Sequence, residues 1–301
     1  MPFEPIATTP SAYAYPLLIK QLLHSAKATA GNQEIVYRDH SRYTYRQFLE
    51  RIGRLANALS GLGIAPGDTV AVMDWDSHRY LEAFFAVPMM GAVLQTVNVR
   101  LSPEQILYTL NHAKADIVAV NVEFIPLLAI IKDQLETVKK FILISDDGAT
   151  MSSFKVPYAG EYEALLAAAP ASYNFPDFDE NTRATTFYTT GTTGLPKGVY
   201  FSHRQLVLHT LATTGMLGSA PWLWRPNSAP RPGKATCIAA MCICRLRRCS
   251  TSMPGASPMS RPCSASSRFI PAVMRPTPCS SSSPMKASPS RIACRPSCTC
   301  C

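Results

Sequence analysis

A segment rich in glycine and threonine carries the clearest chemistry in the sequence. It runs from Tyr188 to Gly198 and reads Y-T-T-G-T-T-G-L-P-K-G. Eleven residues hold three glycines, four threonines and one lysine. Glycine lets backbone N–H groups approach an anion closely, threonine hydroxyls add donors, and lysine adds a positive charge. The segment therefore predicts a phosphate-binding loop.

The spacing of this loop differs from that of the P-loop, G-x-x-x-x-G-K-[ST]. Pro196 stands where the P-loop has its second glycine. For a motif as short as G-T-T-G, a surface loop without a ligand is the alternative. The full string follows a predicted strand at Thr185–Tyr188, and its length favours the phosphate-binding interpretation.

The residues before the loop alternate between strand and helix patterns. Apolar residues at steps of three and four predict helices, at Phe48–Leu62, Ser77–Met90, Ser102–Ala113, Leu127–Val138 and, after the loop, His203–Thr214. Short apolar runs predict buried strands, at Thr69–Met73, Ala92–Val97, Asp116–Val120, Phe141–Ile144 and Thr185–Tyr188. This alternation predicts the α/β class, with a largely parallel sheet flanked by helices on both faces. Residues 146–180 have no clear period.

Composition divides the chain into two parts. All 20 acidic residues lie at or before Glu180, and all 10 cysteines lie at or after Cys237. Residues 1–218 contain 17 Lys and Arg against those 20 acids, a net charge of −3. Residues 219–301 contain 12 Lys and Arg and no acid, so the overall charge of +9 comes from the tail. The positive overall charge is therefore no evidence that residues 1–218 form a basic enzyme.

The loop string, extended by Val199, resembles the phosphate-binding signature of the AMP-forming adenylate synthetases, which include acyl-CoA synthetases and luciferases. Further segments share this resemblance: Thr44-Tyr45, Arg54-Leu55-Ala56, Gly67-Asp68, Tyr80-Leu81-Glu82-Ala83, Gly91-Ala92-Val93, Asn98-Val99-Arg100-Leu101 and Tyr200-Phe201-Ser202-His203. It covers about residues 20–218 and is strongest toward medium- and long-chain fatty acyl-CoA ligases. The resemblance implies an N-terminal portion of the adenylate-forming fold.

The same resemblance implies an activity and its small-molecule partners. Such an enzyme activates a fatty acid with ATP and Mg2+ to an acyl-adenylate, and then transfers the acyl group to CoA. In-line attack on the α-phosphate builds negative charge that loop donors can stabilise. The expected contacts on the pyrophosphate side are Thr189, Thr190, Gly191, Thr192, Thr193, Gly194 and Lys197.

Several other polar residues have weaker patterns. His203 follows the loop where the family often has a histidine, and a surface histidine at a helix start is the alternative. His78 and His112 lie in predicted helices and are interpreted as structural or surface residues. Asp74, directly after a predicted strand, is expected to serve a turn.

The tail combines 13 prolines, 16 serines and 10 cysteines over residues 219–301. Its cysteines give only fragments of the paired spacing that zinc sites use. A basic tail for nucleic acid or an anionic membrane would normally be richer in lysine or aromatic residues, so no nucleic-acid partner is expected. A GC-rich gene read out of frame explains the composition better, and it predicts a disordered tail.

The codons that can encode the tail also permit a second reading frame. Synonymous codons for Met241–Cys301, read one nucleotide earlier, permit 61 consecutive residues that begin D-V-Y-M-P-I-T-P-M-F-H-V-H-A-W-G. The result has ordinary acids and the family's M-F-H-V-x-x-W-G segment. We therefore expect a one-nucleotide frameshift between about Gly218 and Met241.

These observations give two hypotheses. In the first, residues 1–218 are the N-terminal part of an adenylation domain, residues 219–301 are out of frame, and the chain is an inactive, truncated ligase. In the second, a nucleotide-binding regulatory protein carries a genuine cysteine-rich basic tail. No signal peptide or membrane-spanning run is predicted from the sequence, so a cytoplasmic location is the expectation.

Overall fold

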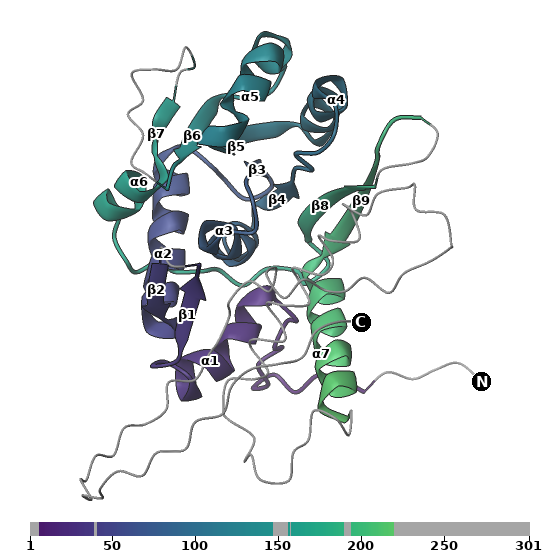
Figure 1. The fold of residues 1–301 in the computed structure, drawn as a ribbon. Coiled ribbons are helices and arrows are strands. Elements are labelled where there is room, and N and C mark those ends of the chain that lie inside the picture. The colour runs from purple at the N-terminus through teal and green to yellow at the C-terminus, as the bar shows by residue number, and fades with distance from the viewer. Residues whose placement is uncertain (1–5, 39–40, 147–155, 157, 190–193, 220–301) are drawn as a thin grey trace, which may run out of the picture.

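A mostly parallel β-sheet forms the centre of the protein (Figure 1). The structure is a computed structural model that describes residues 6–38, 41–146, 156, 158–189 and 194–219. Within these residues the sheet has seven strands: β3 (Thr69–Met73), β4 (Val93–Thr96), β5 (Ala115–Asn121), β6 (Lys140–Ile144), β7 (Tyr158–Glu161), β8 (Arg183–Thr189) and β9 (Lys197–Ser202). Their order is β7-β6-β5-β3-β4-β8-β9, with β8 and β9 antiparallel and the other neighbours parallel.

Helices pack on both faces of this sheet. The described helices are α1 (Leu23–Thr29), α2 (Tyr45–Gly61), α3 (His78–Met89), α4 (Pro103–Ala113), α5 (Ile125–Ile131), α6 (Tyr162–Ala168) and α7 (His203–Ser219). Three short 3₁₀ turns accompany them: η1 (Ile19–Leu22), η2 (Val122–Phe124) and η3 (Lys132–Gln134). A small antiparallel pair, β1 (Glu34–Tyr37) and β2 (Ser41–Thr44), lies beside α2.

Side-chain caps explain where several helices begin. Thr44 and Gln47 form a reciprocal capping box at the start of α2. The Ser77 hydroxyl accepts from the Tyr80 amide at α3, and the Ser102 hydroxyl accepts from the Gln105 amide at α4. Each cap satisfies an amide that the first helical turn leaves without a partner. These caps fix the points at which the chain leaves β2 and the carboxyl ends of β3 and β4.

The sheet separates two apolar cores. Phe48, Phe84 and Phe85 from α2 and α3 belong to the core on one face. Ile106 and Leu110 from α4 belong to the core on the other face. Helix α3 therefore leaves β3 toward one face, while α4 leaves β4 toward the opposite face. In α/β sheets such a reversal opens a ligand-binding crevice at the carboxyl ends of the strands.

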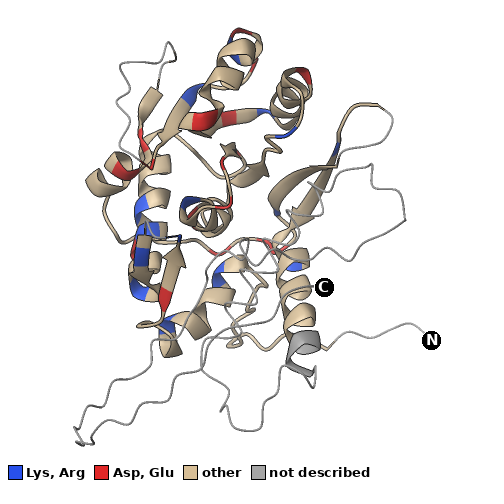
Figure 2. Ribbon diagram, viewed as in Figure 1, with Lys and Arg blue, Asp and Glu red and all other residues tan. Residues whose placement is uncertain are grey.

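A buried ion-pair cluster joins α2, α3 and α6. Glu82 in α3 is 0% exposed and accepts from Arg51 Nε at 2.6 Å. It also accepts from the hydroxyls of Tyr43 at 3.0 Å and Tyr162 at 2.8 Å. Arg51 extends to Glu163 of α6 with two bonds of 2.9 Å. Figure 2 shows basic residues on α2 and an acidic residue on the neighbouring α6.

The α/β class and the mostly parallel sheet are confirmed, but one predicted helix is wrong. The helix expected over Leu127–Val138 is α5, which ends at Ile131 and is followed by η3. The Asn111 side chain explains the end of this segment: its Nδ2 donates to the Gln134 carbonyl at 3.1 Å, and its Oδ1 accepts from the Glu136 amide at 3.2 Å. The chain is thereby directed into β6.

Candidate functional site

The predicted phosphate loop joins β8 to β9. Thr189 ends β8, Lys197 begins β9, and the two residues are paired in the antiparallel register. The Thr189 hydroxyl donates to the Lys197 carbonyl at 3.4 Å, and both residues are exposed. Thr190, Gly191, Thr192 and Thr193 lie outside the described residues. Among the expected phosphate contacts, the structure therefore brings Thr189 and Lys197 together at the mouth of the hairpin.

Gly194 shows why glycine is needed in this loop. Its φ is +102°, a backbone conformation that side chains with a Cβ rarely adopt. Among the described residues, no heavy atom lies within 4 Å of the position that a Cβ would take. The open space leaves room for an anion to approach the backbone. The next part of the loop exposes Leu195, whereas Pro196 is buried.

The loop lies at the carboxyl edge of the parallel strands. β8 pairs with β4 in parallel through Leu94–Thr185 and Gln95–Thr186. Thr189 is therefore the carboxyl-terminal residue of β8 and lies at the carboxyl edge of the parallel strands. Ligands of open α/β sheets bind at this edge. The position of the loop agrees with a nucleotide site.

Tyr188, one residue before the expected contacts, fixes the end of β8. A 2.8 Å hydrogen bond joins its hydroxyl to Nδ1 of His112 at the end of α4. Burial raises the pKa of the Tyr188 hydroxyl, so the phenol stays neutral. Gly198 in β9 lies close to Tyr188 and His112, and a Cβ at Gly198 would lie 3.4 Å from the Tyr188 ring. Sequence reasoning missed this contact because His112 is 76 residues away.

His203 is a buried residue, so the alternative of a surface histidine is wrong. It begins α7 with 0% exposure, and its Nδ1 accepts from the Ile19 amide at 3.3 Å. Burial lowers the pKa of the imidazole to about 4. The residue lies at the base of the β8–β9 hairpin, at the opposite end of β9 from Lys197.

Asp74 serves the turn after β3, as the sequence predicts. Its carboxylate accepts from the Trp75 amide at 2.8 Å, from Asn121 Nδ2 at 2.7 Å and from the Ser77 hydroxyl. Burial raises the pKa of Asp74, while these hydrogen bonds oppose the shift. The group therefore connects the carboxyl ends of β3 and β5.

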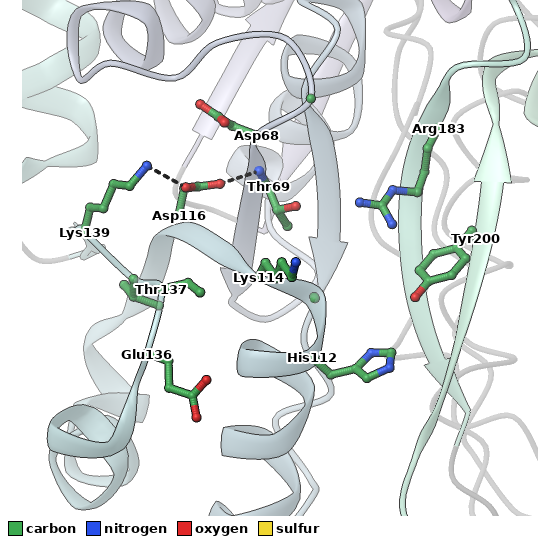
Figure 3. Close-up of a pocket in the computed structure, with 13 residues that line it drawn as sticks. Asp68, Thr69, His112, Lys114, Asp116, Glu136, Thr137, Lys139, Arg183 and Tyr200 are labelled. Atoms are coloured by element: carbon green, nitrogen blue, oxygen red, sulfur yellow. Dashed lines mark hydrogen bonds and ion pairs between the residues drawn. The ribbon is translucent and has the colours of Figure 1, made fainter.

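A separate cavity of about 810 Å³ lies at the opposite edge of the sheet (Figure 3). Its walls include Thr69 and Arg183, the first residues of β3 and β8. Asp116 in this cavity bonds Lys139 at 2.9 Å and the Thr69 amide at 2.9 Å. Arg183 is six strand residues from Thr189, or about 20 Å. Neither Thr189 nor Lys197 lines the cavity, but His112 and Tyr200 do, and they connect its wall to Tyr188 and Thr186 of β8.

Two features are absent from the described residues: a cluster of metal ligands and a membrane-spanning helix. No group of three or more His, Cys, Asp or Glu side chains gathers there as a metal site would require. No helix in the same residues combines the length and apolar character of a bilayer-spanning segment. The cysteines of the tail lie outside the described residues.

The fold and the loop define a class of protein: an α/β protein whose parallel sheet carries a glycine-rich hairpin loop at its carboxyl edge. The family model for AMP-binding enzymes matches residues 22–226. The chain belongs to this family of AMP-binding enzymes.

Two curated relatives and one solved structure illustrate the match. The chain is 41% identical to a long-chain-fatty-acid–CoA ligase of Thermus thermophilus, over 66% of this chain and 36% of the relative. It is 37% identical to a 3-methylmercaptopropionyl-CoA ligase of Ruegeria lacuscaerulensis, over 66% of this chain and 37% of the relative. The fold matches an anthranilate CoA ligase in complex with anthranoyl-AMP with a TM-score of 0.61 at 23% identity, over 66% of this chain and 38% of that chain. The chain thus spans little more than a third of the length of these relatives.

Proposed function

We propose that residues 1–218 are the N-terminal part of the adenylation domain of a fatty acyl-CoA ligase, and that residues 219–301 are encoded out of frame. In the intact enzyme, a fatty acid reacts with Mg2+-ATP to give an acyl-adenylate and pyrophosphate. The CoA thiol then displaces AMP to give the acyl-CoA thioester. We assign the intact enzyme to the cytoplasm.

The geometry of the hairpin loop carries this proposal. Gly194 has a positive φ and open space beside it, while Thr189 and Lys197 are exposed and paired across the mouth of the hairpin. A backbone open to an anion, a hydroxyl and a lysine charge suit phosphate groups. The carboxyl-edge position suits a nucleotide. These described residues fit the phosphates of ATP.

The chemistry needs stabilisation of negative charge more than it needs a protein base. A carboxylate oxygen of the fatty acid attacks the α-phosphorus in line, and the bond to the pyrophosphate oxygen breaks. Lys197 and the loop donors hold the pyrophosphate as its charge grows. Mg2+ bound to the phosphates supplies further charge neutralisation. In this scheme the loop positions the leaving group.

The tail leads us to propose that the 301-residue chain itself does not catalyse the reaction. The chain covers 36–37% of the two ligase relatives, and the family match ends at residue 226, shortly after the acid-free tail begins at residue 219. We expect the chain to keep pyrophosphate binding through its loop and to form no acyl-adenylate. Neither the family match nor the ligase relatives support the alternative of a regulatory protein with a genuine cysteine-rich tail.

The gene sequence provides the first test. Adding or removing one base near codons 218–240 should open a long frame that encodes the remaining ligase sequence. The frame-restored protein should then exchange labelled pyrophosphate into ATP when a fatty acid is present, and its Lys197→Ala variant should do so far more slowly. An acyl-CoA product from the purified 301-residue chain would overturn the proposed inactivity. A closed frame at every single-base change would overturn the frameshift.

A further inference from the structure

The base of the β8–β9 hairpin continues beyond the two strands. The His203 amide donates to the Thr182 carbonyl at 3.1 Å, and the Arg204 amide donates to the Glu180 carbonyl at 2.8 Å. One leg of the hairpin therefore begins near Glu180, and the other ends near Arg204. The base and the loop therefore lie at opposite ends of the paired strands β8 and β9.

The N-terminal segment binds both legs at this base. We name residues 16–20 the N-terminal clasp. The Leu17 amide donates to Glu180 Oε2 at 2.7 Å, on the leg that enters β8. The Ile19 amide donates to Nδ1 of His203 at 3.3 Å, on the leg that leaves β9. Glu180 also binds the Arg204 guanidinium, so its carboxylate joins the clasp to both legs.

The contact at His203 is the buried one. His203 is 0% exposed and Ile19 is 1% exposed, so water cannot replace either partner. The Phe178 ring packs edge-on against the imidazole, with 4.9 Å between ring centroids. Lys20 anchors the clasp further through Asp177 Oδ1 at 2.8 Å and the Phe175 carbonyl at 2.9 Å. The imidazole is therefore held in one orientation.

We propose that His203 is a positioning residue, through which the N-terminal clasp fixes the base of the hairpin and so the geometry of the phosphate loop. This inference rests on the proposed function of the loop. His203 does not touch the phosphates in this scheme. Its Nδ1 accepts the Ile19 amide and locks the second leg against the first, which raises the fraction of molecules whose loop is ready to bind.

Two substitutions and one control separate this role from general stability. In His203→Asn the side-chain Oδ1 can take the place of Nδ1 as an acceptor, whereas His203→Leu offers none. Ile106→Val, in the core on the other face of the sheet, weakens packing without touching the hairpin. The 301-residue chain of each variant is compared by amide hydrogen exchange and by pyrophosphate titration in a calorimeter.

In His203→Leu we expect the amides of β8 and β9 to exchange roughly tenfold faster or more, because a buried donor loses its acceptor. The pyrophosphate Kd should rise about threefold to tenfold. His203→Asn should stay near wild type in both measurements. Ile106→Val should leave the pyrophosphate Kd unchanged and should not single out the hairpin.

The inference is overturned if His203→Leu leaves amide exchange in the hairpin unchanged, or speeds exchange equally throughout the chain. It is also overturned if His203→Asn changes exchange and the pyrophosphate Kd as much as His203→Leu does. Failure of the proposed function looks different. In that case wild-type protein would not bind pyrophosphate, while the hairpin amides would still depend on His203.

Discussion

Replacing Glu82 by glutamine should lower the free energy of unfolding by about 3 kcal/mol. Its Oε1 accepts from Tyr43 and Arg51 Nε, and its Oε2 accepts from Tyr162 and Arg51 Nη2. In Glu82→Gln, an NH2 group replaces one carboxylate oxygen. This NH2 group is a donor, and it would face two other donors. Hydrogen bonds to charged groups contribute about 1.5–3 kcal/mol each. The loss is limited because Arg51 keeps its two bonds to Glu163.

Urea unfolding of the 301-residue chain, followed by far-UV circular dichroism, measures this difference. The matched control is Glu34→Gln, because Glu34 pairs with Arg42 on the surface, where the two side chains are 35% and 57% exposed. An exposed ion pair contributes about 1 kcal/mol or less. The thermal midpoint should fall by about 6–12 °C for Glu82→Gln, at 2–4 °C per kcal/mol in a domain of this size.

Two results would refute this reasoning. A Glu82→Gln variant within 0.5 kcal/mol of wild type, a difference typical of surface substitutions, would show that the buried cluster contributes little. An equal loss in Glu34→Gln would show that the effect comes from net charge, and that burial of the carboxylate at α3 has no special role.

Three further predictions concern single residues. Gly53→Ala should destabilise the chain by about 1–3 kcal/mol, because its Cβ would lie 2.0 Å from the Ala171 carbonyl oxygen, whereas Gly61→Ala in the same helix has open space and should not. The contribution of His203 to the free energy of unfolding should fall by about 3 kcal/mol from pH 6.5 to pH 4, because the unfolded chain protonates His203 over this range while its native pKa is about 4. The difference between wild type and His203→Asn in a pH titration of stability measures this contribution. Lys197→Ala should weaken pyrophosphate binding by the 301-residue chain at least tenfold in calorimetry, with no change in melting temperature, because the side chain is exposed.

Sequence patterns formed by residues close together in the chain predict the core of the fold well. The run Thr69–Met73 is a fully buried strand, and its short length and β-branched residues favour a strand over a buried helix. Ser102 and Pro103 begin α4 as expected, because capping is a matter of adjacent residues. The candidate phosphate loop could be predicted for the same reason, since its residues are contiguous.

The sequence patterns do not predict elements that depend on contacts between residues far apart in the chain. β7 is a four-residue edge strand, and α6 has only seven residues, so neither gives a measurable period. β9 has three exposed residues, three half-buried residues and no buried one, and it pairs only with β8 among the described strands, so its sequence lacks the apolar run of a buried strand. The burial of His203 depends on Ile19, which lies 184 residues earlier. Local sequence carries no signal for such a contact.

The N-terminal clasp has a consequence for the order of events during translation. Leu17 and Ile19 bind partners that lie 163 and 184 residues later in the chain. At about 5–20 residues per second, a ribosome needs roughly 10–40 seconds to synthesise that stretch. Strands β3 to β6 can pair in the meantime, since their partners emerge early. The first segment made is therefore among the last to dock, and it remains open to proteases and chaperones until α7 has left the exit tunnel.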